Sequence, residues 1–324
     1  MKKRTLGKDL EVSAIGIGCM TVGKDYSEQS RSEAIEILRH AYELGYTMFD
    51  TAEIYGGTYR NEELVGEALK PIRDKVKIAT KCGLTMDAAG HMVMDSSREN
   101  IRRSIEGSLQ RLQTDHVDLY YIHRIDPNTP IEEVALTMKQ LFEEGKILHW
   151  GLSEPNMDTL RRAHAVFPVT AIESEYNMMW REPEEEILPT LEELGIGLVP
   201  YRPLARGFLS DVIEGVYLKG AKNTRFDEEN LKNNIALRDL LQKLSGEKHV
   251  TSAQLALGWL LAQKPFIVPI PGITKMERLQ ENTAAAEISF TAEELKNIRS
   301  LLDSIVITGE RYDPESDNGK SVRK

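Results

Sequence analysis

The feature that most constrains the fold is a regular alternation of short strand-like runs with amphipathic helical stretches, repeated eight times. The runs are rich in β-branched and aromatic residues and lie at 14–18, 48–52, 76–81, 117–123, 147–153, 170–176, 197–204 and 266–272. An open doubly wound sheet seldom has so regular a count without a topological switch. The pattern therefore predicts an α/β fold, a closed (β/α)8 TIM barrel, formed as one domain over residues 1–324.

Two further elements are expected outside the eight units. The segments KRTLG and EVSAI, on either side of Lys8 and Asp9, predict an N-terminal hairpin that covers the bottom of the barrel. Thr291 and Glu294 have the spacing of a capping box, which predicts an extra C-terminal helix over 291–304.

Three stretches exceed the usual loop length: residues 83–97, residues 205–230 and the tail after Ser304. Long loops on the upper face of a barrel commonly shape substrate pockets, so we expect these stretches to do so. The tail after about residue 312 is polar, which favours flexibility, and a lid over the substrate is the alternative.

Composition narrows the class of protein. The formal charge of −10 argues against a nucleic-acid binder. No run of about 18 apolar residues is present, and the basic start has no apolar region after it, so we expect a cytoplasmic protein without a membrane segment. Cys19 and Cys82 give neither a disulfide framework nor metal-type spacing, and no HExxH pattern occurs, so no metal site is expected.

Four polar residues lie at or just beyond the ends of three successive predicted strands: Asp50, Tyr55, Lys81 and His123. The carboxyl ends of parallel barrel strands converge on one rim, so these side chains can share a pocket. Taken singly, each has a structural explanation, such as an interface tyrosine or a buried ion pair. Their combination at one rim favours an enzyme site.

The chemistry of the group is that of a proton donor. A phenol has a pKa of about 10 and donates poorly unless its anion is stabilised, which an ammonium such as Lys81 can do. A buried lysine needs a carboxylate to keep its charge, and Asp50 is available on the neighbouring strand. His123 could orient a carbonyl oxygen against Tyr55. Only a hydride source is then lacking.

A cofactor site is expected at the later strand ends. Gly16 and Gly18 do not begin a Rossmann fingerprint, because Thr21 stands where the third glycine belongs. Tyr201 offers a ring for stacking on a nicotinamide, and Lys275 and Arg278, at the start of the last barrel helix, suit an anionic phosphate.

Seven blocks, in this order and spacing, resemble the aldo-keto reductase family: DTAEIYG, TKCG, DLYYIHRID, GLSE, ESEYN, YRPLARGFL and PIPGITKMERLQEN. The resemblance runs from the first strand to about residue 288, and it is nearest to soluble bacterial and plant reductases. It implies NADPH-dependent reduction of an aldehyde or ketone, with Tyr55 as proton donor, Asp50 and Lys81 tuning it, and His123 orienting the carbonyl.

The resemblance also implies a set of cofactor contacts. Nicotinamide would stack on Tyr201, and its carboxamide would bond to Ser153, Glu154 and Glu173. Lys275 and Arg278 would hold the 2′-phosphate, which favours NADPH over NADH. Leu204 and Arg206 would lie near the pyrophosphate, and Glu281 and Asn282 near the adenine. Gly272, in the PIPG block, is the remaining residue implied for the cofactor site.

Three positions depart from the family pattern. Glu173 replaces the usual glutamine, and an ionised glutamate accepts hydrogen bonds but cannot donate them. Arg202 replaces the usual serine and could contact a phosphate or point to Glu173 or another acid. Ala205 stands near the usual glycine of that block.

Two alternatives to a carbonyl reductase stay open from the sequence. One is a regulatory protein that keeps the nucleotide site but turns over poorly, and the other is an enzyme that works mainly as an alcohol oxidant. The expected partner is a small-molecule carbonyl, while the particular substrate and the oligomeric state are not specified by the sequence.

Overall fold

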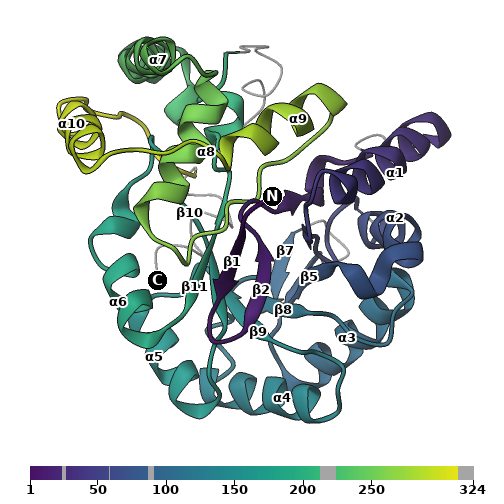
Figure 1. Cartoon of the computed structure of the whole chain (residues 1–324). Helices are drawn as coiled ribbons and strands as arrows, with labels where there is room; N and C mark the ends of the chain where they lie inside the picture. The colour runs from purple at the N-terminus through teal and green to yellow at the C-terminus, as the bar shows by residue number, and fades with distance from the viewer. Residues whose placement is uncertain (24–26, 58, 87–90, 212–223, 313–324) are drawn as a thin grey trace.

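In the computed structural model of this protein, parallel strands close into a barrel with helices around it (Figure 1). The structure describes residues 1–23, 27–57, 59–86, 91–211 and 224–312. Seven strands form one sheet in the order β11-β10-β9-β8-β5-β4-β3. They are β3 (Ile17–Gly18), β4 (Met48–Asp50), β5 (Lys77–Cys82), β8 (Leu119–Ile122), β9 (Trp150–Ser153), β10 (Ala171–Glu175) and β11 (Gly197–Tyr201).

Residues 266–272 close the barrel between β11 and β3. The amide of Val268 donates to the Leu198 carbonyl at 2.9 Å, and the amide of Gly18 donates to the Pro271 carbonyl at 3.0 Å. Pro269 and Pro271 have no N–H, so this edge pairs only in part and forms isolated bridges rather than a regular ladder. The predicted TIM barrel is confirmed, although its eighth strand is irregular.

The helices that follow the strands bury one apolar face each. In α3 (Arg98–Leu112), Ile101, Ile105 and Leu109 are buried at the spacing expected from the sequence. The other barrel helices are α1 (Glu28–Glu43), α2 (Arg60–Leu69), α4 (Ile131–Glu143), α5 (Met157–Val166), α6 (Ile187–Leu194), α8 (Ser252–Gln263) and α9 (Met276–Ala285).

Two helices are additional to the eight units. The predicted C-terminal helix is present as α10 (Ala292–Asp303), and both bonds of its capping box form between Thr291 and Glu294. The other, α7 (Glu228–Lys248), lies between β11 and α8 and was not predicted from the sequence. No helix among the described residues is long and apolar enough to span a membrane.

The N-terminal hairpin covers the bottom of the barrel, as predicted. Strands β1 (Lys3–Leu6) and β2 (Leu10–Ser13) pair antiparallel, and Gly7 turns the chain with a φ of +58°. Leu6 and Leu10 are buried in one cluster with Val199 from the barrel interior. The hairpin therefore seals the amino ends of the strands and leaves the opposite rim for chemistry.

Parts of the long stretches are ordered. Residues 83–97 contain a short ribbon of β6 (Leu84–Met86) and β7 (Met92–Met94), and residues 205–230 contain short 3-10 helices over Ala205–Gly207 and Thr224–Phe226. The rest of the predicted loop regions, at 87–90 and 212–223, lies outside the described residues. The same holds for the tail after residue 312, so its predicted flexibility stays a prediction.

We expect Leu6→Ala to lower the free energy of unfolding by about 2–5 kcal/mol, because it removes a fully buried side chain from the plug at the bottom of the barrel. Thr5→Ala, on the exposed face of the same strand, is the matched control and should change it by less than about 1 kcal/mol. Urea denaturation of both variants measures the difference. Equal stability of the two would show that the hairpin does not seal the core.

Candidate active site

The site lies one step above the apolar core on the inward faces of the strands. Side chains along a strand alternate, so residues two apart face the same way. Buried Met48 and Ala79 belong to the cluster inside the barrel, and the residues two places further along their strands are Asp50 and Lys81. The same step leads from Ala171 to Glu173 and from Val199 to Tyr201. On each of these four strands, the change from apolar to polar thus occurs at the inward position that follows the apolar cluster.

Lys81 is the centre of this polar level. Its ammonium donates to a carboxylate oxygen of Asp50 and, at 2.9 Å, to the backbone carbonyl of Thr51. A carboxylate oxygen of Glu173 lies 3.2 Å from the same nitrogen. The side chains of Lys81, Asp50 and Glu173 are at most 4% exposed, so water screens these charges little.

Tyr55 and His123 lie against this cluster from two loops. Tyr55 follows β4 and its ring centroid is 5.3 Å from the Lys81 ammonium. His123 follows β8, is 8% exposed, and meets the Tyr55 ring edge-on at 5.7 Å between centroids. The Nδ1 atom of His123 has no hydrogen-bond partner among the described residues. The four residues predicted from the strand ends are therefore neighbours in space.

The environment sets the protonation states of these groups. The pKa of Tyr55 is raised to about 12, mainly by desolvation and further by the charges of Glu173 and Asp50. The charge of Lys81 acts in the opposite direction and lowers this pKa. Burial, together with Arg124 and Lys81, holds the pKa of His123 well below its ordinary value. Burial alone would lower the pKa of Lys81, but Asp50 and Glu173 outweigh it and raise that pKa. Near pH 7 the site thus holds a phenol, a neutral imidazole and an ammonium.

Arg124 is a site residue that the sequence did not single out. Its side chain is 6% exposed and donates to the Ser153 hydroxyl at 2.9 Å and to the His123 carbonyl at 2.7 Å. It therefore links the end of β9 to the loop that carries His123. The only sequence signal was its place directly after the histidine in DLYYIHRID.

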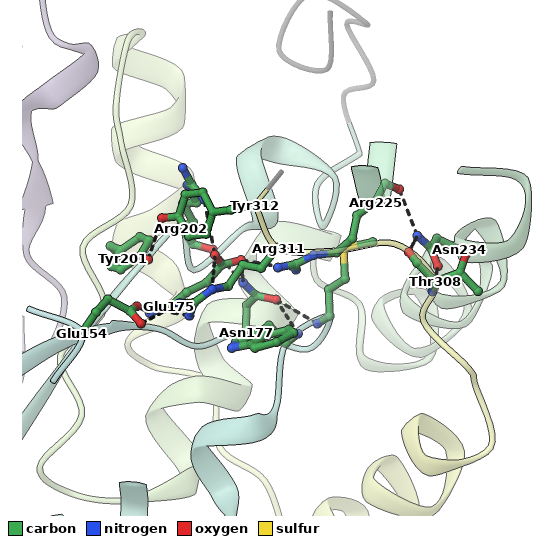
Figure 2. A network of polar contacts seen from close by, with 12 residues as sticks. Glu154, Glu175, Asn177, Tyr201, Arg202, Arg225, Asn234, Thr308, Arg311 and Tyr312 are labelled. Carbon is green, nitrogen blue, oxygen red and sulfur yellow. Dashed lines mark hydrogen bonds and ion pairs between the residues drawn. The ribbon is translucent and has the colours of Figure 1, made fainter. Parts of the chain in front are cut away.

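A second charged group, shown in Figure 2, joins the upper strand ends to the C-terminal segment 305–312. Arg311 donates to both carboxylate oxygens of Glu154, at 2.6 and 3.2 Å. The Tyr312 hydroxyl is 2.9 Å from the Tyr201 hydroxyl. Two residues that the resemblance places at the nicotinamide are thus in contact with the chain's own C-terminal segment.

The same group binds Arg202, for which two orientations were open from the sequence. In the structure it points to an acid, since its guanidinium is 3.4 Å from Glu175 and lies over the rings of Tyr201 and Tyr312. Glu175 also accepts from Arg225 at 3.3 Å. Reciprocal hydrogen bonds of 2.8 and 2.9 Å between Asn234 and the backbone of Thr308 hold the segment to α7.

The loop after β11 has an unusual backbone. Arg202, Ala205 and Arg206 have φ values of +49°, +47° and +58°, which side chains other than glycine rarely adopt. Leu204 precedes the short helix of this loop, and the Arg206 Nε atom is buried without a hydrogen-bond partner among the described residues. Such strain commonly accompanies ligand-binding loops.

The remaining predicted cofactor residues lie on α9 and the turn before it. Lys275 precedes the helix and its side chain makes no capping hydrogen bond, which leaves the first amides of α9 available to an anion. Arg278 donates to Glu281 at 2.6 Å, and Asn282 is buried. Gly272 is exposed, and a Cβ there would approach the Thr21 hydroxyl at 2.8 Å.

Among the described residues, no cluster suited to a metal ion occurs.

The chain belongs to the aldo/keto reductase family, whose sequence profile matches residues 14–303. It is 41% identical to a probable aldo-keto reductase of Glycine max over 308 residues, which cover 93% of this chain and 89% of that protein. The barrel described above is therefore that of a family of oxidoreductases.

Solved structures give the same result. The chain is 33% identical to a thermostable aldo-keto reductase crystallised with the inhibitor epalrestat, with a TM-score of 0.76 over 93% of this chain and all of the other. It is 27% identical to the glycerol dehydrogenase of Gluconobacter oxydans, with a TM-score of 0.85 and coverage of 94% and 96%. An aldo/keto reductase of Klebsiella pneumoniae, in complex with NADP and acetate, matches at 26% identity and a TM-score of 0.76, with coverage of 97% and 99%.

We expect Arg311→Ala to release the segment 305–312, because it removes the guanidinium that donates to both carboxylate oxygens of Glu154. Hydrogen exchange in this segment should rise, and the free energy of unfolding should fall by about 3 kcal/mol. Arg299→Ala is the control, since that side chain is 61% exposed and its ion pair with Glu184 should contribute less than about 1 kcal/mol. Unchanged exchange at 305–312 would show that Arg311 does not hold the segment.

Proposed function

We propose that this protein reduces aldehydes or ketones to alcohols with NADPH, and that Tyr55 is the proton donor. The observation that supports this most strongly is the convergence of Asp50, Lys81, Tyr55 and His123 at one rim of a barrel whose opposite end is sealed. The substrate class is a small carbonyl compound. Adding a hydride to the carbonyl carbon and a proton to its oxygen converts it to the alcohol.

In the proposed mechanism, the carbonyl oxygen lies between Tyr55 and His123. The neutral imidazole donates an N–H to that oxygen and holds it in place. A bound NADPH would supply the hydride for the carbonyl carbon, and the Tyr55 hydroxyl would give its proton to the oxygen. The phenolate left on Tyr55 is stabilised by the Lys81 ammonium, which Asp50 keeps charged.

The residues present fit a dinucleotide. The Tyr201 ring at the end of β11 suits stacking on nicotinamide, and we assign Ser153, Glu154 and Glu173 to its carboxamide. The strained Leu204–Arg206 loop is assigned to the pyrophosphate, where Arg206 would supply positive charge, whereas Arg202 pairs with Glu175. Aldo-keto reductases of Klebsiella pneumoniae that were solved with NADP and with NADPH support this assignment.

The phosphate that distinguishes NADPH from NADH is assigned to the start of α9. Lys275 and Arg278 supply two cations beside uncapped helix amides, a combination that favours an anion. Arg278 pairs with Glu281 in this structure, so binding the phosphate requires the guanidinium to turn from that carboxylate. Gly272 keeps the preceding turn free of a side chain, and Asn282 is assigned to the adenine side.

Alcohol oxidation by the same site is the second candidate, favoured by the likeness to a glycerol dehydrogenase. Both directions use the same residues, because the proton that Tyr55 donates in reduction returns to it in oxidation. Activity should therefore be measured with NADPH and carbonyls and with NADP+ and alcohols. Binding of NADPH without turnover in either direction would support a regulatory role instead.

We expect Tyr55→Phe to lower kcat for carbonyl reduction by at least about a hundredfold, because the variant lacks the donated proton. The dissociation constant for NADPH should stay within about twofold, since the hydroxyl is not assigned to the cofactor. Tyr59→Phe is the matched control, because Tyr59 lies in the same loop and is 44% exposed. Loss of NADPH absorbance measures turnover, and equal turnover in Tyr55→Phe and the parent would remove Tyr55 from the role of acid.

We expect Lys275→Ala combined with Arg278→Ala to raise the dissociation constant for NADPH at least about tenfold more than that for NADH. Both cations are assigned to the phosphate that only NADPH carries. Lys296→Ala with Arg299→Ala removes the same charge from exposed positions of α10 and is the control. Fluorescence titration gives the constants, and equal weakening of both cofactors would contradict the assignment.

A further inference from the structure

Lys81 has a second acidic neighbour that the resemblance does not account for, because the family usually has glutamine where Glu173 stands. Glu173 is 3% exposed and lies in the middle of β10. Its carboxylate oxygen is 3.2 Å from the Lys81 ammonium, which also binds Asp50. A glutamine in this place would leave Lys81 with one acid, and the glutamate gives it two.

The charges in this cluster do not balance when both acids are ionised. Lys81 contributes one positive charge and the two carboxylates contribute two negative charges, in a region that water scarcely reaches. Burial and then the charge of Asp50 raise the pKa of Glu173 to about 8. Glu173 is therefore mainly a neutral acid at pH 7 and an anion above about pH 8.

Few other groups around Glu173 can compensate for that charge. Tyr121 on β8 also lies close to the Lys81 ammonium, and its hydroxyl has no hydrogen-bond partner among the described residues. Arg124, after β8, favours the anion of Glu173. The register neighbours of Glu173 are Ser153 on β9 and Val199 on β11, and neither carries a charge. The other titratable groups near the cluster are Cys19, Tyr55 and His123, and among these the Tyr55 hydroxyl is the proposed proton donor.

We propose that Glu173 is a positioning residue whose negative charge, acting through the Lys81 cluster, keeps the Tyr55 hydroxyl protonated at alkaline pH. A phenolate at Tyr55 would add a further negative charge to a cluster that already has an excess of one. Glu173 therefore opposes ionisation of the phenol and extends reduction to higher pH. This inference rests on the proposed role of Tyr55 as the acid.

The effect of Glu173 on Tyr55 depends on pH. Below about pH 7, Glu173 carries its proton, so it has the charge of glutamine and can donate a hydrogen bond as glutamine does. Its replacement by glutamine should then leave the ionisation of Tyr55 unchanged. Above about pH 8 the two residues differ by one full charge, and only there should the chemistry of Tyr55 diverge.

The test is Glu173→Gln, with kcat/KM for carbonyl reduction measured from pH 6 to 12 and the NADPH dissociation constant measured at each pH. The activity of each variant at pH 6–7 serves as its own reference, because Glu173 is also assigned to the nicotinamide carboxamide, and only the pH dependence is compared with that of the parent. The alkaline limb of Glu173→Gln, where activity falls as Tyr55 ionises, should lie at least about one pH unit lower than that of the parent. Glu173→Asp retains the charge and should recover part of the shift.

Two results would overturn the inference. An alkaline limb at the same pH in Glu173→Gln and the parent would show that the charge does not reach Tyr55. A uniform loss at every pH would show a structural role alone.

A turnover-independent measurement separates this inference from the proposed function. The ionisation of Tyr55 is followed by tyrosinate absorbance, as the difference between the parent and Tyr55→Phe. The same difference is taken between Glu173→Gln and Glu173→Gln with Tyr55→Phe. Tyr55 should ionise at lower pH in the Glu173→Gln background even where no carbonyl is reduced. Identical difference titrations would reject the inference, whereas absence of turnover alone would reject only the reductase.

Discussion

The buried ammonium of Lys81 is the constraint on which the rest of the site depends. A charge removed from water is stable only beside a counter-charge and with its donors satisfied, and the barrel provides these from adjacent strands through Asp50 and the Thr51 carbonyl. Because Lys81 is held charged, a phenolate at Tyr55 can be tolerated during the proposed reaction. Losing Asp50 would therefore affect Tyr55 without any contact between the two.

The apolar interior below this level explains why the chemistry is confined to one rim. The hairpin fills the bottom of the barrel with Leu6, Leu10 and Val12, and the inward residues of the strands continue that core upward. Asp50, Lys81 and Glu173 lie within two residues of the ends of their strands, so the ion pairs of Lys81 rest on a packed apolar base. That base fixes the side-chain positions and limits the screening of their charges.

The sequence predicted the barrel and the four rim residues because both depend on local patterns that repeat at strand ends. It did not predict Arg311 or Tyr312, since an arginine and a tyrosine in a polar tail give no sign of contact with Glu154 and Tyr201, more than a hundred positions earlier. The extra helix α7 was missed because it follows a long stretch that reads as a loop. The sequence showed that Glu173 departs from the family pattern, but only the structure shows that its carboxylate lies 3.2 Å from the Lys81 ammonium.

The two groups of charged residues at the rim have net charges of opposite sign when their acids and bases are all ionised. Around Lys81, two carboxylates face one ammonium, and negative charge there disfavours a phenolate at Tyr55. Above it, the group around Glu154 and Glu175 contains more arginines than acids: Arg124, Arg202, Arg225 and Arg311. In the proposed function, positive charge at the upper level would attract an anionic dinucleotide, whereas the lower level would retain the proton of Tyr55. The proposed cofactor and proton-donor sites would thus differ in depth along the barrel, since each level is set by which residues alternate inward along the strands.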